Sequence, residues 1–290
     1  MRPVPPQVLL LGSIGSVQFG AAFANRLFPQ AGPGGVVLLR LALSAVMMCV
    51  AIRPSLRSRS RTAVTSVITF GLILGTMNWS FYEALNRLPI GIAVTIEFIG
   101  PLGVAIAGSR RAIDLLWVAL AGGGVALLAL HGEQHGISVT GVLLALLAAA
   151  CWAGYILVSK WVGSEWEQLQ GLAVALCIGT LVVIPVGIVQ GGAALGRPSV
   201  LAGGAAVAVL SSVLPYSLEL IALRRLPAAV FGLLMSVEPA VAALAGVLVL
   251  HQSLTAVTLV AILMVVVASA GTTVAARRPA LEPDMAAGPQ

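Results

Sequence analysis

The sequence predicts an all-α membrane protein with ten transmembrane helices, arranged as two inverted five-helix repeats. Three observations support this prediction. The chain of 290 residues is 59% hydrophobic and only 9% charged, with a mean hydropathy of +1.04. Soluble domains carry roughly 25% charged residues, so this much apolar surface needs lipid rather than an aqueous core. The apolar residues form segments of transmembrane length, and one motif recurs at a fixed offset of 138 residues.

Ten apolar segments are long enough to cross a bilayer, since a transmembrane helix needs roughly 17–25 residues. The joins between them are short and leave no stretch for a soluble domain, so we expect one membrane domain. The first segment is longer than the core of a signal peptide and is followed by further spans, which predicts a retained helix. The predicted spans are residues 7–27, 34–52, 63–85, 90–108, 113–131, 137–160, 169–190, 199–223, 228–250 and 254–276.

The two halves of the chain repeat one another. The segments Ala84–Pro89 and Ala222–Pro227 both end in Arg-Leu-Pro and lie 138 residues apart, and Pro101 is matched by Pro239 at the same offset. Each half holds five spans, an odd number, so the second half enters the membrane from the opposite side and the repeats are inverted. Such repeats share a cavity near the middle of the membrane. We expect a first repeat over residues 1–131, a second over 132–278 and a disordered cytoplasmic tail over 279–290.

The net charge of +6 indicates membrane topology rather than nucleic-acid binding. If the N-terminus is cytoplasmic, twelve basic residues fall in cytoplasmic segments and three in outer loops, while Arg40 lies within a span. Cytoplasmic loops of membrane proteins carry an excess of Lys and Arg. The distribution therefore predicts that both termini are cytoplasmic.

Two carboxylic acids lie deep within predicted spans. Glu97 is near the middle of the fourth span, and Glu238 is near the middle of the ninth, directly before Pro239. A charged residue at the bilayer centre costs roughly 2.5–3.5 kcal/mol on insertion scales, so such residues are usually kept for function. We expect them to bind a cationic group of a substrate or to exchange a proton. The alternative is a structural carboxyl group that is hydrogen-bonded to neighbouring helices.

Prolines inside the spans predict broken helices near these acids. A proline removes the hydrogen bond to the carbonyl four residues earlier. Freed carbonyls in a membrane must face protein or a wet cavity. The prolines concerned are Pro101, Pro215 and Pro239, which free the carbonyls of Glu97, Ser211 and Met235 respectively.

Polar and aromatic side chains share helix faces in several spans, which suits a pocket for a small polar solute. The alternative is that the aromatic rings mark the membrane interfaces and the polar groups bond between helices. The candidate pocket residues are Gln18, Asn78, Tyr82, Trp152, Tyr155, Tyr216 and Glu219.

Two other charged residues have simpler expected roles. Glu83 is expected to pair with Arg87, one helical turn further along. Arg40 lies about six residues into the second span and is expected to extend to the lipid headgroups. The alternative for Arg40 is that it binds a substrate carboxylate.

No catalytic, cofactor or metal site is predicted. His131 and His135 have the spacing of metal ligands on a helix, but Gly132 and Gly136 would break a helix there. The sequence contains neither a P-loop pattern for ATP nor a readable Ser-His-Asp or Cys-His arrangement. We therefore do not expect an enzyme.

Five short stretches together resemble a known family. They are Arg87–Pro89, Glu97–Pro101, Pro215–Glu219, Arg225–Pro227 and Ser236–Pro239. They are similar to the EamA branch of the drug/metabolite transporter superfamily, and within it to bacterial threonine/homoserine exporters, and the resemblance covers residues 7–278. The resemblance implies two inverted five-helix repeats, cytoplasmic termini and a central cavity lined by helices one, three, four, six, eight and nine.

The resemblance also implies a secondary exporter of small amino acids, threonine and homoserine first, or of related metabolites, coupled to the proton gradient by alternating access. A broad exporter of drugs, purines or sulfur amino acids is the alternative, and a membrane-embedded lipid enzyme or a non-transporting subunit is a more distant one. The expected location is the bacterial cytoplasmic (inner) membrane. The expected partners are a small-molecule substrate and the lipid bilayer, without nucleic acid or cofactor, and a monomer is compatible with the sequence.

Overall fold

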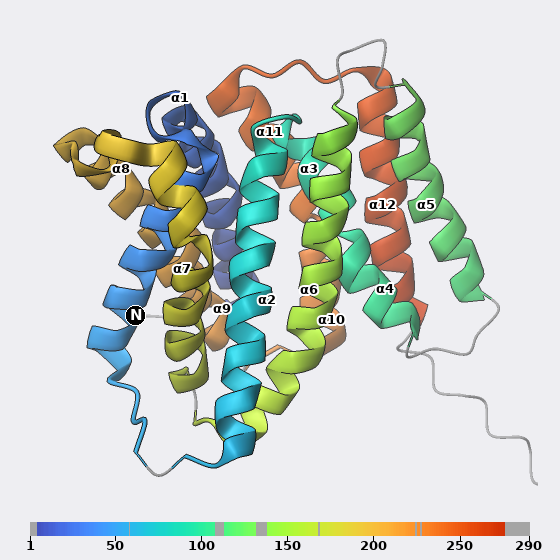
Figure 1. Ribbon diagram of the computed structural model, residues 1–290. Coiled ribbons are helices and arrows are strands. Elements are labelled where there is room, and N and C mark those ends of the chain that lie inside the picture. The colour runs from blue at the N-terminus through green and yellow to red at the C-terminus, as the bar shows by residue number, and fades with distance from the viewer. Residues whose placement is uncertain are drawn as a thin grey trace, which may run out of the picture.

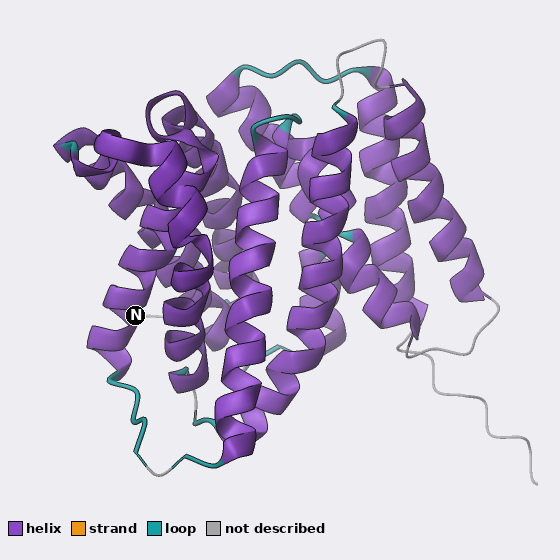
Figure 2. Cartoon of the chain, in the orientation of Figure 1, coloured by secondary structure: helices purple, strands orange, loops and turns teal. Residues whose placement is uncertain are grey.

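The computed structural model describes residues 5–57, 59–107, 113–131, 138–167, 169–223, 225–226 and 228–275. Helices dominate this part of the chain, and no strand occurs in it (Figure 2). The elements are α1 (Pro6–Ile52), α2 (Arg61–Leu85), α3 (Ile90–Glu97), α4 (Ile99–Ala107), α5 (Ile113–His131), α6 (Val139–Glu165), α7 (Gln170–Gly191), the 3-10 turn η2 (Gly192–Gly196), α8 (Pro198–Ala208), the π-helical turn η3 (Val209–Val213), α9 (Leu214–Leu223), α10 (Ala228–Met235), α11 (Glu238–Leu250) and α12 (Ala256–Ala275).

The described helices are those of a multi-span membrane protein. Eight of them, counting segments joined across short breaks, are long and apolar enough to cross a membrane, and α5 contains a shorter apolar stretch, Leu115–Leu128. Large side chains such as Val50, Leu115 and Val189 are exposed on the outside of the bundle. An exposed apolar surface of this kind suits contact with lipid. The predicted class, an all-α protein with several spans, is confirmed, whereas the number of ten spans and the inversion of the repeats stay predictions.

The first two predicted spans both lie in α1, which is interrupted at Gly32. This glycine has φ 65° and ψ 160°, a conformation that essentially only glycine adopts. Beyond the break, the second half of α1 descends to the loop that leads into α2 (Figure 1).

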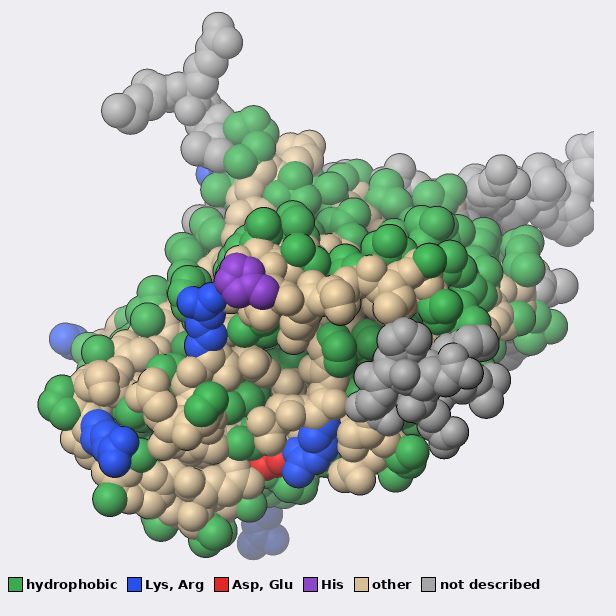
Figure 3. Space-filling view, turned by 90° about the horizontal axis from the view of Figure 1, so that it is seen from above, with side chains coloured by type: hydrophobic (Ala, Val, Ile, Leu, Met, Phe, Trp, Pro, Cys, Tyr) green, Lys and Arg blue, Asp and Glu red, His purple; other side chains and the backbone are tan. Residues whose placement is uncertain are grey.

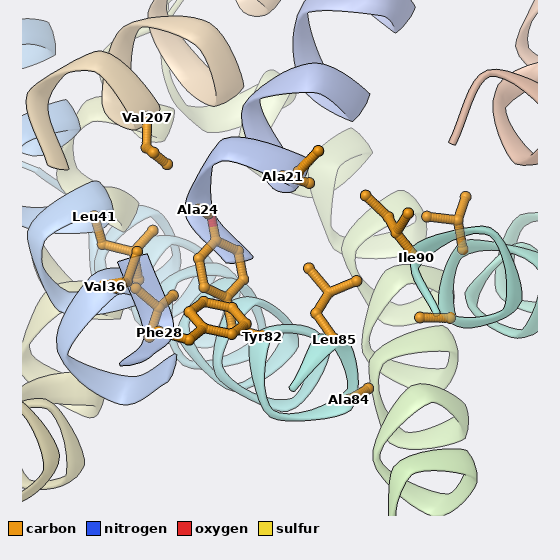
Figure 4. Packing of buried hydrophobic residues seen from close by; sticks show 14 of the residues in the cluster. Ala21, Ala24, Phe28, Val36, Leu41, Tyr82, Ala84, Leu85, Ile90 and Val207 are labelled. Atoms are coloured by element: carbon orange, nitrogen blue, oxygen red, sulfur yellow. The ribbon is translucent and has the colours of Figure 1, made fainter. Parts of the chain in front are cut away.

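The helices pack around α1 and α2. Helix α1 contacts α7, α8, α9 and α11, and α2 packs against α6 and α7, while α5 and α12 form a neighbouring pair (Figure 1). Small and branched side chains fill the space between α1 and α2, with the rings of Phe28 and Tyr82 side by side, 5.8 Å between centroids (Figure 4). Helix α1 thus joins elements that are far apart in the sequence.

Two helix breaks and one π-helical turn lie close to the three prolines. Helix α3 ends at Glu97 and α10 ends at Met235, the two residues whose carbonyls Pro101 and Pro239 were expected to free. Helices α4 and α11 continue after short turns. Pro215 follows the π-helical turn η3, in which the regular hydrogen-bond pattern is replaced.

Some expectations fall outside the described residues. These are the boundary between the repeats after residue 131, the segment with Gly132, His135 and Gly136, and the tail 279–290.

Gly100 allows α4 and α6 to approach closely. A Cβ atom at Gly100 would lie 2.1 Å from the carbonyl oxygen of Ala149, whereas one at Gly103, also in α4, would meet nothing within 4 Å. We expect Gly100→Ala to lower the free energy of unfolding by about 1–3 kcal/mol, because backbone must shift to admit the methyl group. The melting temperature of the purified protein in detergent measures this. The matched control, Gly103→Ala, should melt at or slightly above the wild-type temperature. Equal melting of the two variants would contradict the close packing.

Candidate functional site

Glu97 and Glu238 lie at opposite kinds of helix end. Glu97 is the last residue of α3 and Glu238 is the first residue of α11, and both are buried. The N-terminal end of a helix carries partial positive charge and the C-terminal end partial negative charge. The start of α11 therefore attracts negative charge, whereas the end of α3 attracts positive charge. The two carboxyl groups are near enough to interact electrostatically.

Arg40 lies inside the protein, so the expectation that it extends to lipid headgroups was wrong. Its side chain is 8% exposed. The guanidinium donates to the Tyr82 hydroxyl at 3.2 Å, to the Ser212 hydroxyl at 3.4 Å and to the Ser211 carbonyl at 2.9 Å. Pro215 has no amide hydrogen to offer the Ser211 carbonyl, and an unsatisfied carbonyl in hydrocarbon is costly. The carbonyl of Ser211, in the π-helical turn η3, thus accepts a hydrogen bond from Arg40.

Two serines of α1 that were not among the predicted site residues hydrogen-bond to η3 and to the beginning of α9. Ser16 donates to the Leu210 carbonyl at 2.6 Å. The Ser13 hydroxyl lies 3.3 Å from the Pro215 carbonyl and 2.7 Å from Oε1 of Glu219. The signal available in the sequence was the run of polar residues at 13, 16 and 18 within an apolar span.

Tyr155 of α6 and Tyr216 and Glu219 of α9 are near enough to influence one another electrostatically. Glu219 interacts electrostatically with both tyrosines and with Glu238, and Tyr216 interacts with Arg40. The Tyr155 ring stacks on Phe70 with 4.7 Å between centroids, which holds its hydroxyl end in a fixed direction.

Gln18 and Glu238 are neighbours with unused hydrogen-bonding capacity. The Gln18 side chain lies beside the carboxyl group of Glu238. Oε1 of Gln18 and Oε2 of Glu238 nevertheless have no partner in the described part of the protein, although both are buried. Buried polar atoms without a partner within the protein are uncommon, and they are suited to hydrogen-bond a bound solute.

The two remaining candidates lie at different distances from this group. Trp152 packs edge-on against Phe98, next to Glu97, with 5.5 Å between ring centroids. Asn78 is buried but donates to the Leu74 carbonyl of its own helix at 2.9 Å. Seven predicted residues therefore lie near enough to influence one another or Arg40, whereas Trp152 packs beside Glu97 and Asn78 has a partner in its own helix. The linked residues, here called the central polar group, are Gln18, Tyr82, Glu97, Tyr155, Tyr216, Glu219 and Glu238, together with Arg40.

Glu83 belongs to a separate polar group near the end of α2. Its carboxylate pairs with Arg87 at 2.5 Å, as expected, and accepts a hydrogen bond from Gln190 at 2.7 Å. Gln190 in turn accepts from the amide of Gly34, just beyond the break in α1. The pair of Glu83 with Arg87 is the one ion pair within the described residues. No carboxyl group of the central polar group therefore pairs directly with Arg40.

Two cavities lie apart from the central polar group. One, of about 430 Å³, lies between α1 and the turn that joins α2 to α3, and Phe28, Arg87 and Gln252 are among its lining residues. The other, of about 720 Å³, is a largely apolar groove between α4 and α6. None of the nine candidate residues lines either cavity. No cluster of three metal-ligating side chains occurs among the described residues.

Comparisons with known proteins agree on one family. The model of the EamA-like transporter family matches residues 139–274. The chain is 43% identical over 282 residues to the threonine/homoserine exporter RhtA of Escherichia coli K12, covering 96% of this chain and 95% of the relative. It is 43% identical over 274 residues to RhtA of Salmonella typhimurium LT2, covering 94% and 92%.

A solved structure described only as "Crystal structure of protein" has the same fold. Its TM-score is 0.63 at 16% identity, with 93% of this chain and 98% of that chain covered. At this identity the likeness concerns the fold alone.

The contrast between Glu83 and Glu238 can be measured as stability. Glu83 has an arginine partner and a glutamine donor, whereas Oε2 of Glu238 has none in the described residues. We expect Glu83→Gln to lower the free energy of unfolding by about 1–3 kcal/mol, since it leaves partners unsatisfied. Glu238→Gln should leave the melting temperature in detergent unchanged or raise it, because function rather than stability keeps an unpaired buried acid. A large loss of stability in Glu238→Gln alone would show that Glu238 is structural.

Proposed function

Because the chain belongs to the EamA-like transporter family, we propose that it is a secondary exporter of small amino acids, with threonine and homoserine as the first candidates. The support for this substrate class is the 43% identity, over nearly the whole chain, to relatives named as exporters of these two amino acids. Both the family and these relatives are transporters, not enzymes. The location that goes with this function is the bacterial cytoplasmic membrane.

Two inverted repeats of five helices, over residues 1–131 and 132–278, form part of the proposal. The ends of α3 at residues 90 and 97 correspond to the ends of α10 at residues 228 and 235, and Leu85 at the end of α2 corresponds to Leu223 at the end of α9. Each pair is 138 residues apart. With α1 divided at Gly32 and α5 counted as a span, each repeat holds five helices. The family match at 139–274 lies within the second repeat.

The proposed topology places both termini in the cytoplasm. Arg53, Arg57 and Arg59 lie between α1 and α2, and Arg61 is the first residue of α2, all at one end of the bundle. Figure 3 looks down on the opposite end, where basic side chains are spread apart over the described surface and one of them touches an acidic side chain. An excess of basic residues at one end supports its assignment to the cytoplasmic side.

Glu97 is the observation that supports the transport mechanism best. It is a buried carboxyl, at the end of a helix that attracts positive charge, and it forms no ion pair within the described residues. An ammonium group or a proton supplies the missing positive charge. We assign this role to Glu97, and to Glu238, Glu219 and Gln18 the part of adjusting the charge around it, while Asn78, Tyr82, Trp152, Tyr155 and Tyr216 shape the binding site.

Alternating access requires one contact in particular to open. Helix α3 packs against α11, where a Cβ atom at Gly91 would lie 2.9 Å from Cα of Ala243. In the proposed topology this contact lies on the outer side of Glu97 and closes the route outward. The breaks beside Pro101 and Pro239 let the outer half-helices move without the inner ones. Protonation of Glu97 after release of the substrate would then couple export to the proton gradient.

Replacing Glu97 by Gln should abolish transport without unfolding the protein. Counterflow of labelled threonine in proteoliposomes, with and without an imposed pH gradient, measures this. We expect the initial rate of Glu97→Gln to fall at least 100-fold, because an amide neither holds a proton nor attracts an ammonium group. The matched control is Glu167→Gln, an exposed carboxyl, which should transport as wild type. Transport by Glu97→Gln at the wild-type rate would contradict the role assigned to Glu97.

The substrate class is tested in the same proteoliposomes. Unlabelled threonine and homoserine should compete with labelled threonine more strongly than purines, sulfur amino acids or bulky cationic drugs. Equal competition by all of these would favour a broad exporter, and no uptake of any solute would favour a non-transporting subunit.

The topology is tested by cysteine labelling in intact cells. In a variant without native cysteines, Ala193→Cys should react with a membrane-impermeant maleimide, since residue 193 is exposed at the proposed outer end. Arg57→Cys should react only after the membrane is permeabilised. The reverse pattern would invert the proposed orientation.

A further inference from the structure

We propose that Arg40 binds the α-carboxylate of the exported amino acid, at a site formed with the Ser211 carbonyl, the Ser212 hydroxyl and the Tyr82 hydroxyl. This inference rests on the proposed function and extends it: it names the chemical group of the substrate that the protein recognises. It also restricts the substrate to molecules with a free carboxylate beside an ammonium group.

Burying the positive charge of Arg40 costs free energy. The side chain is 8% exposed within an apolar bundle, and its three hydrogen-bond partners, Tyr82, Ser211 and Ser212, are all neutral. A buried charge is tolerated when a charge of opposite sign compensates it. Among the described residues none does so at contact distance, since the one ion pair is that of Glu83 with Arg87. A bound carboxylate supplies the compensation.

The Arg40 guanidinium has more N–H donors than its partners in the protein use. A guanidinium has five N–H groups in a fixed fork, which matches the two oxygens of a carboxylate. Arg40 uses three of them, one each on Nε, Nη1 and Nη2. One N–H on each terminal nitrogen is left. These three bonds orient the guanidinium on α1, and the remaining two donors have no hydrogen-bond partner among the described residues, so a ligand could accept from them.

The carboxyl group of Glu97 lies within electrostatic range of Arg40. The positive charge of Arg40 acts on the carboxyl of Glu97 and on the hydroxyl of Tyr216. Arg40 and Glu97 are both buried, and they do not form an ion pair with each other. An α-amino acid carries its two opposite charges on groups attached to one carbon atom. Its ammonium would bind Glu97 and its carboxylate Arg40, since each residue carries the charge opposite to that of the group it would bind.

Unpartnered hydroxyl groups lie beside Arg40. The hydroxyls of Ser44, one helical turn beyond Arg40 in α1, and of Ser211 are buried, and neither has a hydrogen-bond partner in the described structure. Ser211 also supplies the carbonyl that holds Arg40. Hydroxyl donors of this kind suit the second oxygen of a carboxylate or the side-chain hydroxyl shared by threonine and homoserine.

The test compares an amino acid with the same molecule lacking its carboxylate charge. Threonine and threonine amide are used as competitors in counterflow of labelled threonine, and as ligands in thermal-shift measurements on the protein in detergent. The variants are Arg40→Gln, Arg40→Lys and Tyr82→Phe, with Arg197→Gln as the control that removes an exposed positive charge. In Arg40→Gln, we expect the KM for threonine to rise about 10- to 100-fold, while the weak competition by threonine amide stays unchanged.

The intermediate variants separate binding from structure. Arg40→Lys keeps the charge but lacks the fork, so its KM should lie between those of wild type and Arg40→Gln. Tyr82→Phe removes one group that orients the guanidinium, and should raise the KM for threonine several-fold with no effect on the amide. If Arg40→Gln does not fold, the comparison of acid and amide in Tyr82→Phe and in the wild type still decides the question.

Three results would overturn the inference: an unchanged KM for threonine in Arg40→Gln, an equal loss of affinity for acid and amide, or a wild-type protein that binds both alike. The last result counts against Arg40 whether or not threonine is transported. Failure of the wild type to exchange threonine or homoserine, with a thermal shift that still prefers acids over amides, would instead contradict the proposed function alone.

Discussion

The bond between Arg40 and the Ser211 carbonyl organises the centre of this protein. In hydrocarbon each backbone carbonyl needs a partner, and Pro215 cannot give one to Ser211. Arg40 does so at 2.9 Å from a helix that is 171 residues away in the sequence, and Tyr82 of α2 holds the same guanidinium. A cation is thereby fixed inside an apolar bundle. We propose that this cation and Glu97 bind the two opposite charges of the substrate.

The two halves share a backbone plan but not its chemistry. Helices α3 and α10 have matching ends 138 residues apart, yet the acids are shifted: Glu97 closes α3, whereas Glu238 opens α11. Because the two ends of a helix carry partial charges of opposite sign, one acid lies where positive charge is attracted and the other where a carboxylate is stabilised. A shift of three residues relative to the matching ends of α3 and α10 is enough to give the two acids different electrostatic surroundings.

Local features of the sequence predicted local features of the structure. The helix ends at Glu97 and Met235 follow from the prolines after them, and the pair of Glu83 with Arg87 follows from a spacing of four residues. The errors concern contacts between distant segments. Arg40 has the long side chain of a residue that reaches headgroups, and its position alone does not reveal the freed carbonyl of η3. Ser13 and Ser16 looked like ordinary polar residues in an apolar span until α9 and η3 were seen beside them.

The sequence by itself determined that this is a helical membrane protein, where its helices break and which acids lie within its spans. These depend on side-chain hydrophobicity and on proline geometry, both properties of short segments. Only the tertiary structure decided which groups meet: that Arg40 turns inward to η3, that Ser13 reaches Glu219, and that Asn78 keeps to its own helix. The reason is that in an apolar bundle each polar group takes whichever partner the packing of distant helices brings within reach.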